Sequence, residues 1–129
     1  MGIMDMAEQA LKEVQRLSAS EAVARSSDET LVFVDVRDVR EVAQSDTIQG
    51  SRHAPRGMIE FWFDPESPYY RDIYGDPDKT YVLFCNGDPR SALSAKALQD
   101  MGVVNVAHLA GGMPAWRDAG GPTETKDRT

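Results

Sequence analysis

The sequence contains a single cysteine, Cys85, and only two histidines, His53 and His108, among its 129 residues. One cysteine excludes an internal disulfide and a cysteine-based zinc site, and it leaves no second thiol to resolve an oxidised Cys85. Neither histidine lies close in sequence to a second metal-ligating residue. We therefore expect no metal site and no cofactor, and we expect both histidines to be strand residues with ordinary hydrogen bonds.

Basic residues and long apolar runs are also scarce. The chain has 14 Lys and Arg against 21 Asp and Glu, a formal net charge of −7, which would repel the phosphate backbone of a nucleic acid. No apolar run approaches the roughly 18 residues of a membrane-spanning helix, and the N-terminus lacks the basic-then-apolar order of a signal peptide. These absences predict a cytoplasmic protein with no nucleic-acid partner and no membrane attachment.

The length of the chain suits one domain. Apolar residues recur at helical spacing near the start, which predicts an amphipathic helix over residues 1–13. A domain follows over residues 14–122 and ends at the turn formers Gly120, Gly121 and Pro122. The remaining polar residues, 123–129, are predicted to be a mobile tail.

Within the domain, apolar runs alternate with helical patterns. The strongest strands are Leu31–Val36, Tyr81–Phe84 and Val106–Leu109, with shorter strands near Arg16 and His53. Helices are predicted between them, including one over Met58–Phe63 and one from Ser91 to Met101, which Gly102 ends. Such alternation predicts an α/β fold with a parallel sheet covered on both faces. The segment from Asp64 to Lys79, rich in proline and tyrosine, is predicted to be an ordered surface excursion that could serve as a lid.

Cys85 ends one of these strands, and a turn leads from it directly into a helix. The residues Asn86, Gly87, Asp88 and Pro89 are all turn formers. The first turn of a helix has unpaired N–H groups and a partial positive charge, so it stabilises anions such as a thiolate. Arg90 adds a fixed positive charge beside the same turn. The alternative is that Cys85 is an inert core residue, the commoner fate of a buried cysteine.

Asp35 and Arg37 stand at the carboxyl end of another strand. In open α/β sheets, sites form at that edge, so polar residues there either act in the site or shape it. We expect these two residues to cap loops and to pair with neighbours. Glu41 is close enough in sequence to be the partner of Arg37.

Four motifs, in this order and spacing, resemble those of the rhodanese-like sulfurtransferase family, and the resemblance extends from about Val14 to Pro122. They are Asp35-Val36-Arg37 followed by Glu41; the run from Thr47 to Pro55, in which Thr47 replaces a histidine of the family; Cys85-x4-Arg90-Ser91; and Leu109-x-Gly111-Gly112-x3-Trp116. The stretch from Arg56 to Tyr69 also resembles a subgroup of single-domain members.

The resemblance implies a five-stranded parallel sheet with helices on both faces and a persulfide intermediate on Cys85. The protein would then move a sulfane sulfur from a small donor such as thiosulfate to cyanide or a thiol, with a protein as another candidate acceptor. The loop residues Asn86, Gly87, Asp88, Pro89, Arg90 and Ser91 would bind the donor, and Asp35, Arg37, Glu41 and Arg56 would shape the site.

Two features of the loop bear on the alternatives. In the related phosphatases and arsenate reductases of the same fold, the active-site loop has five residues between cysteine and arginine. This chain has four, so the resemblance favours these activities less. A persulfide carrier or a redox-sensing module without turnover is a further alternative. Asp88 stands where many members have glycine, and we expect its charge to lie near the donor and to disfavour thiosulfate.

Overall fold

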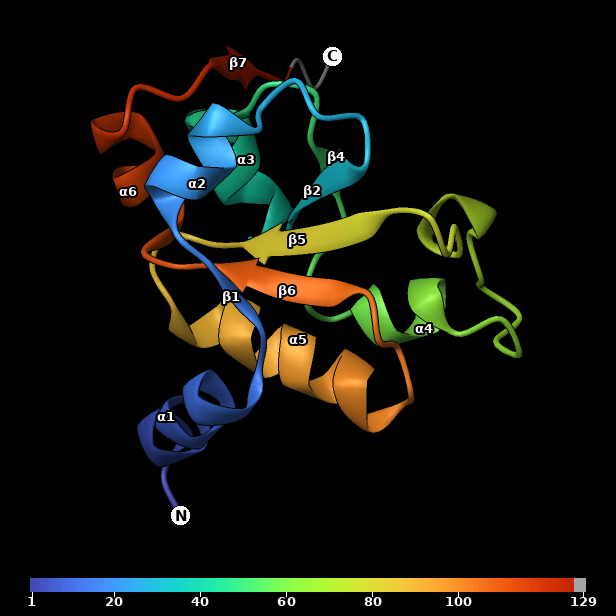
Figure 1. The fold of residues 1–129 in the computed structure, drawn as a ribbon. Coiled ribbons are helices and arrows are strands. Elements are labelled where there is room, and N and C mark those ends of the chain that lie inside the picture. Colours follow the sequence, from blue (N-terminus) through green and yellow to red (C-terminus); the bar gives the residue numbers. More distant parts are fainter. Residues whose placement is uncertain (127–129) are drawn as a thin grey trace.

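The computed structural model describes residues 1–126, and its centre is a five-stranded parallel sheet (Figure 1). In spatial order the strands are β1 (Arg16–Leu17), β6 (Val106–Leu109), β5 (Thr80–Phe84), β2 (Leu31–Asp35) and β4 (Arg52–His53). Every neighbouring pair in this sheet is parallel. The predicted fold class is therefore confirmed, and the three most apolar runs form the three central strands.

Helices cover both faces of this sheet (Figure 1). One face carries α1 (Ile3–Glu13), α4 (Ile59–Phe63) and α5 (Pro89–Asp100), and the other carries α2 (Ala19–Ala24), α3 (Val39–Gln44) and α6 (Gly112–Asp118). Successive strand residues alternate between these faces, so Val34 joins one core cluster and Phe33 joins the other. Burial on both sides explains why the central strands are apolar throughout rather than alternating with polar residues.

A small antiparallel pair, which the sequence analysis did not predict, joins β3 (Asp46–Ile48) to β7 (Thr123–Thr125). The Gly50 amide donates to Glu124 Oε2 at 2.6 Å, and the Gln49 amide donates to Pro122 O at 3.1 Å. Residues 123–125 of the predicted mobile tail are thus an ordered strand, because their backbone pairs with that of β3. Residues 127–129 of that predicted tail lie outside the described residues.

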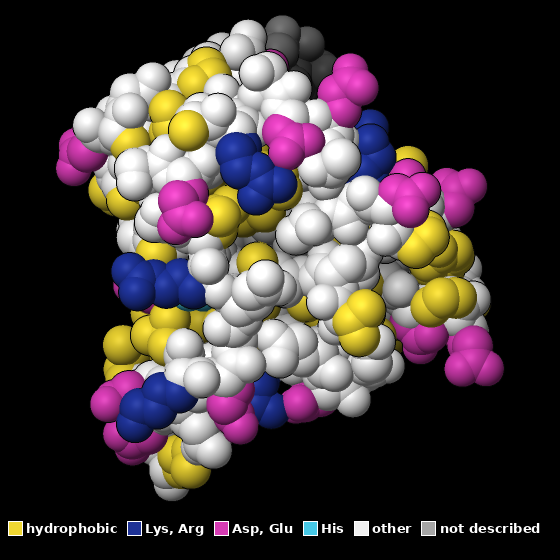
Figure 2. All heavy atoms as spheres, in the orientation of Figure 1, with side chains coloured by type: hydrophobic (Ala, Val, Ile, Leu, Met, Phe, Trp, Pro, Cys, Tyr) yellow, Lys and Arg dark blue, Asp and Glu magenta, His cyan; other side chains and the backbone are white. Residues whose placement is uncertain are grey.

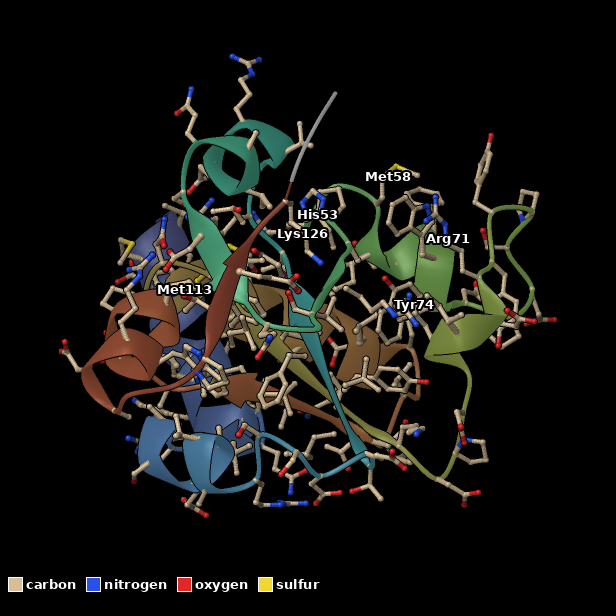
Figure 3. All side chains as sticks on the ribbon, turned by 90° about the horizontal axis from the view of Figure 1, so that it is seen from above. His53, Met58, Arg71, Tyr74, Met113 and Lys126 are labelled. Carbon is tan, nitrogen blue, oxygen red and sulfur yellow. The ribbon has the colours of Figure 1, made fainter. Side chains whose placement is uncertain are left out.

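The excursion from Asp64 to Lys79 is ordered and packs at the end of the sheet opposite Cys85. It contains a short 3-10 helix, η1 (Asp72–Tyr74), beside α4 (Figure 3). Tyr74 stacks on Phe63 with ring centroids 4.5 Å apart, and the Tyr81 hydroxyl donates to Ile73 O at 2.7 Å. Because Tyr81 lies near the start of β5 and Cys85 follows its end, the excursion is part of the distant core rather than a lid over the cysteine.

Charged groups of both signs are mixed over the face drawn in Figure 2, where Lys and Arg side chains lie among Asp and Glu side chains. This distribution accompanies the acidic net charge of −7. Over residues 1–126, no helix has both the length and the apolar character that crossing a bilayer requires.

Candidate active site

Cys85 lies directly after β5, and α5 begins four residues later at Pro89. Proline suits this first helical position because it has no N–H to leave unpaired. The thiol is buried, with the residue only 1% exposed. Its Sγ lies 3.3 Å from Gly87 O and 3.6 Å from Ser91 Oγ. The predicted placement between the carboxyl end of a strand and the amino end of a helix is therefore what the structure has.

The backbone of the Cys85 loop touches the start of α6. The Met113 amide donates to Cys85 O at 2.9 Å. A Cβ atom on Gly112 would overlap Cys85 O and would lie 2.8 Å from the backbone N and O of Gly87, and Gly112 has a φ of +59°. Only glycine fits this close approach. Gly112 thus allows the start of α6 to pack directly against the backbone of the Cys85 loop.

Arg37 and Asp35 form a buried ion pair at the end of β2, with 2.8 Å between Arg37 Nη2 and Asp35 Oδ2. Each side chain is 1% exposed. Arg37 also donates to Asn86 Oδ1 at 3.3 Å and to Asp46 O at 2.8 Å. Thr47 donates to Asp35 Oδ2 at 2.8 Å. This pair therefore ties β2 and β3 to the first residue of the Cys85 loop.

Glu41 pairs with Arg90 and not with Arg37, so the predicted partnership was wrong. Arg90 Nη1 lies 2.6 Å from Glu41 Oε1, and Arg90 Nη2 lies 3.0 Å from Glu41 Oε2. Asn86 Nδ2 also donates to Glu41 Oε2 at 3.1 Å. The hydrogen bonds from Arg90 lower the pKa of Glu41, and in turn they raise the pKa of Arg90. Sequence spacing favoured Arg37, but Asp35 already occupies its guanidinium.

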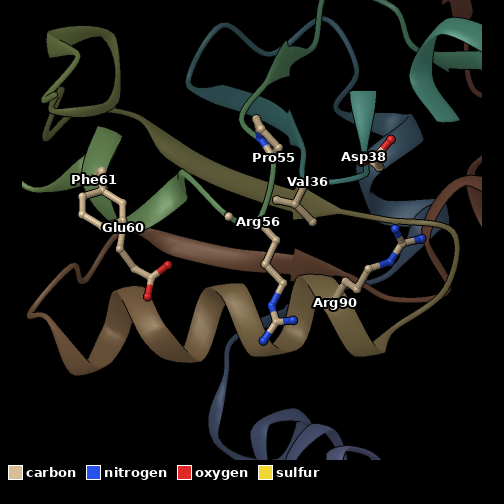
Figure 4. Close-up of a pocket in the computed structure, with 8 residues that line it drawn as sticks. Val36, Asp38, Pro55, Arg56, Glu60, Phe61 and Arg90 are labelled. Atoms are coloured by element: carbon tan, nitrogen blue, oxygen red, sulfur yellow. The ribbon is translucent and has the colours of Figure 1, made fainter. Parts of the chain in front are cut away.

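Arg90 also lines a cavity of about 540 Å³ (Figure 4). Figure 4 shows Arg56 extending from the segment after β4, Glu60 and Phe61 from α4, and Arg90 from α5. The other lining residues are Val36, Asp38, Pro55 and Gly57. Two of the predicted site residues, Arg56 and Arg90, thus meet at one cavity, while Cys85 is buried and is not among its lining residues.

Asp88 does not face this cavity. Its Oδ1 accepts a hydrogen bond from the Gly111 amide at 2.8 Å. It lines a second cavity of about 650 Å³, together with Arg16, His108 and residues of α2 and α6. Asp88 is therefore not part of the Arg90 cavity, and its carboxylate holds the Cys85 loop to the turn before α6. Its expected effect on thiosulfate stays a prediction.

His108 is a site residue that the sequence analysis missed. Its Nδ1 lies 3.2 Å from Ser91 Oγ, and its Nε2 is buried without a hydrogen-bond partner among the described residues. Burial lowers the pKa of His108, an effect that Asp88 opposes and Arg16 supports. His53, by contrast, has the expected ordinary bond, 2.8 Å from Nε2 to Arg37 O. The signal in the sequence was a lone polar residue inside the buried run Val106–Leu109.

Residues 1–126 contain no group of three or more His, Cys, Asp or Glu side chains placed to hold a metal ion. The groups that the structure brings near the Cys85 thiol are Gly87 O and the Ser91–His108 pair, with Arg37 and Arg90 bonded to other residues of the site.

Comparison with known proteins matches residues 18–119 to the family model of the rhodanese-like domain. The structure superposes, with a TM-score of 0.90, on a protein of unknown function from Rhodopseudomonas palustris CGA009 that is named as a possible tyrosine phosphatase. The two chains are 47% identical, and the match covers 96% of this chain and 95% of the other.

More distant matches agree in fold. A thiosulfate sulfurtransferase from Pseudomonas aeruginosa superposes with a TM-score of 0.76 at 23% identity, over 92% of this chain and 22% of that one. An uncharacterized protein from Synechocystis sp. is 44% identical over 45 residues, which are 35% of this chain and 25% of that protein. This chain therefore aligns with only about a quarter of that curated relative.

Proposed function

Because the chain belongs to the rhodanese-like domain family, we propose that it is a sulfurtransferase that carries a sulfane sulfur as a persulfide on Cys85. The observation that supports this most is the loop: Cys85 directly follows β5, and four residues separate it from Arg90, which lines a cavity. A small anion entering that cavity would meet Arg90 and Arg56, and charge-assisted hydrogen bonds from arginine suit such a ligand.

The proposed chemistry has two transfers at sulfur. The Cys85 thiolate attacks the outer sulfur of thiosulfate, an S–S bond forms, and sulfite leaves with the electron pair of the broken bond. Cyanide or an acceptor thiolate then attacks the terminal persulfide sulfur. Thiocyanate or a new persulfide is released, and the Cys85 thiolate is restored.

Asp88 does not line the Arg90 cavity, and its carboxylate accepts a hydrogen bond from Gly111, so a donor bound at Arg90 would not contact it directly. Glu41 is the acidic group that contacts Arg90, and its carboxylate offsets the charge of the guanidinium. An incoming anion must share the guanidinium with Glu41 or displace it. We therefore expect a modest rather than a high affinity for thiosulfate.

A phosphatase is the second candidate, and the name of the R. palustris protein raises it. The four-residue spacing between Cys85 and Arg90 argues against a phosphatase. The related phosphatases have five residues there, which makes a wider loop that holds a tetrahedral phosphate. Hydrolysis of p-nitrophenyl phosphate and reduction of arsenate are the tests for this candidate. Either activity, lost in Cys85→Ser and faster than sulfur transfer, would replace the proposal.

Steady-state turnover of thiosulfate and cyanide tests the proposal itself. We expect thiocyanate formation that Cys85→Ser abolishes without unfolding the protein, since serine matches the shape of cysteine but forms no persulfide. A persulfide that forms once and is not turned over would instead favour a carrier that delivers sulfur to a protein acceptor. The proposal also places the reaction in the cytoplasm, where a lone cysteine stays reduced.

A further inference from the structure

Three buried side chains form a line that leads away from the Cys85 thiol. Ser91 Oγ lies 3.6 Å from Cys85 Sγ and 3.2 Å from His108 Nδ1. Each of the three residues is 1% exposed or less. The thiol group thus has a route for its proton through the protein, although its own surface hardly reaches solvent.

The surroundings of Cys85 make such a route necessary. Burial disfavours a thiolate, because a buried charge loses its hydration. The charge that should offset this cost is that of Arg90, but Arg90 is already paired with Glu41 at 2.6 Å. A nearby group that accepts the thiol proton would become positively charged, and it would stabilise the thiolate in place of the paired Arg90.

His108 is in the right state to be that group. Burial lowers its pKa, which favours the neutral imidazole, and in the tautomer with its proton on Nε2 the Nδ1 atom accepts a hydrogen bond from Ser91. The charged groups that face it are Asp88 from the start of α5, which favours the imidazolium, and Arg16 from β1, which opposes it. The other residues that α1, α2 and α6 place around the same cavity are uncharged: Leu11, Ala19, Ser20 and Ala115.

We infer that His108 is a positioning residue which, through the Ser91 hydroxyl, takes up the proton that Cys85 releases when it becomes a nucleophile. The Ser91 hydroxyl lies 3.2 Å from both Asp88 O and His108 Nδ1, so its hydrogen first turns from Asp88 O to the ring. The S–H bond then breaks as its proton moves to Ser91 Oγ, and the original Ser91 proton moves to His108 Nδ1. The products are a thiolate that accepts a hydrogen bond from Ser91 and an imidazolium beside Asp88. This inference rests on the proposed function only in assuming that Cys85 attacks as a thiolate.

The rate at which iodoacetamide alkylates Cys85, measured against pH, tests the inference without any sulfur donor. Asparagine at 108 can keep a hydrogen bond to Ser91 but cannot take up a proton. We expect His108→Asn to move the midpoint of the alkylation profile upward by about one pH unit, which is about tenfold slower alkylation at pH 7. His53→Asn, at the other histidine, should leave the midpoint in place.

A double variant separates a relay from two independent effects. Ser91→Ala should shift the midpoint as far as His108→Asn does, and combining the two should add nothing further, because either change breaks the same path. An unchanged midpoint in both single variants, or a shift in the double variant equal to the sum of the two, would overturn the inference.

A measurement that leaves Ser91 and His108 unaltered covers the case in which their variants do not fold. The ring nitrogens of the two histidines can be followed by ¹⁵N NMR against pH in the wild-type protein and in Cys85→Ala. We expect the midpoint of the His108 curve to lie at higher pH in the wild type than in Cys85→Ala, because the thiolate favours the imidazolium, while the His53 curve is the same in both. Identical His108 curves would contradict the relay.

Intact mass after incubation with thiosulfate keeps the two ideas apart. If the wild-type protein gains no sulfur but His108→Asn still shifts alkylation, the proposed function fails and the relay stands. If the protein gains one sulfur and neither His108→Asn nor Ser91→Ala shifts alkylation, the relay fails and the proposed function stands.

Discussion

Two arginines reach the Cys85 loop, and they differ most in what surrounds them. Arg37 is buried with Asp35 and donates to Asn86, so its guanidinium is bonded within the protein and is not available to a ligand. Arg90 pairs with Glu41, but its side chain is 37% exposed and lines a cavity. The first arginine therefore builds the loop, and the second is the one that a ligand can reach.

This difference separates stability from activity. Breaking a buried ion pair leaves an uncompensated charge, whereas an exposed pair contributes little to folding because water and salt screen it. A substitution at Arg37 should therefore act on the free energy of unfolding, and the same substitution at Arg90 should act on the donor. The predictions below test this division.

Arg37→Gln should have the largest effect. It leaves Asp35 charged and buried, which costs about 3–5 kcal/mol of the free energy of unfolding. Urea denaturation followed by circular dichroism measures this loss. A loss below about 1 kcal/mol would show that Asp35 finds another partner and that the pair is not the frame of the loop.

Gly112→Ala should cause the second-largest loss of the free energy of unfolding, because the start of α6 packs on the Cys85 loop through backbone atoms. The new methyl group would overlap Cys85 O, and a left-handed φ is unfavourable for alanine, so the two costs together are about 2–5 kcal/mol. Gly50→Ala is the matched control, with a φ of +78° but nothing within 4 Å of the new atom. It should cost only about 1–2 kcal/mol. Equal losses in the two variants would mean that the close approach at Gly112 relaxes freely.

Arg90→Gln should lower the free energy of unfolding by less than about 1 kcal/mol. Its effect should fall on kcat/KM for thiosulfate, through the loss of a charge-assisted contact of about 1.5–3 kcal/mol, or about 10- to 150-fold. Initial rates of thiocyanate formation give this ratio. If Arg90→Gln keeps the kcat/KM of the wild type, the ligand binds elsewhere and the division between the two arginines is wrong.

The smallest effect concerns pH and the buried side of the loop. Because burial lowers the pKa of His108 in the folded state, the unfolded chain binds more protons as the pH falls below about 6.5. Stability should therefore decrease from pH 7 towards pH 5, above the range in which Glu41 titrates. Urea midpoints at these two pH values should differ less in His108→Asn than in the wild type; an equal difference would assign the dependence to other groups.

The sequence predicted the sheet and the position of Cys85 well, because long buried strands and turn formers leave a clear local pattern. The strand Tyr81–Phe84, the turn after Cys85 and the helix beyond it are all present. The pair of β3 and β7 was not predicted, since Thr123–Thr125 is short and polar and becomes a strand only through its partner.

The site was less predictable because its contacts join residues far apart in the sequence. Glu41 meets Arg90 across 49 positions, and Asp88 meets Gly111 across 23. Spacing alone favoured the nearer partner, Arg37, for Glu41. The role of His108 depends on which way a strand residue faces relative to the start of α5, and a single polar residue in a buried run does not reveal this.

Intact mass spectrometry after incubation with thiosulfate tests the central claim most directly. We predict that the wild-type protein gains the mass of one sulfur atom, that cyanide removes it, and that Cys85→Ser gains nothing under the same conditions. An unchanged mass in the wild-type protein with thiosulfate and with other sulfane sulfur donors would contradict the persulfide on Cys85 and the function built on it.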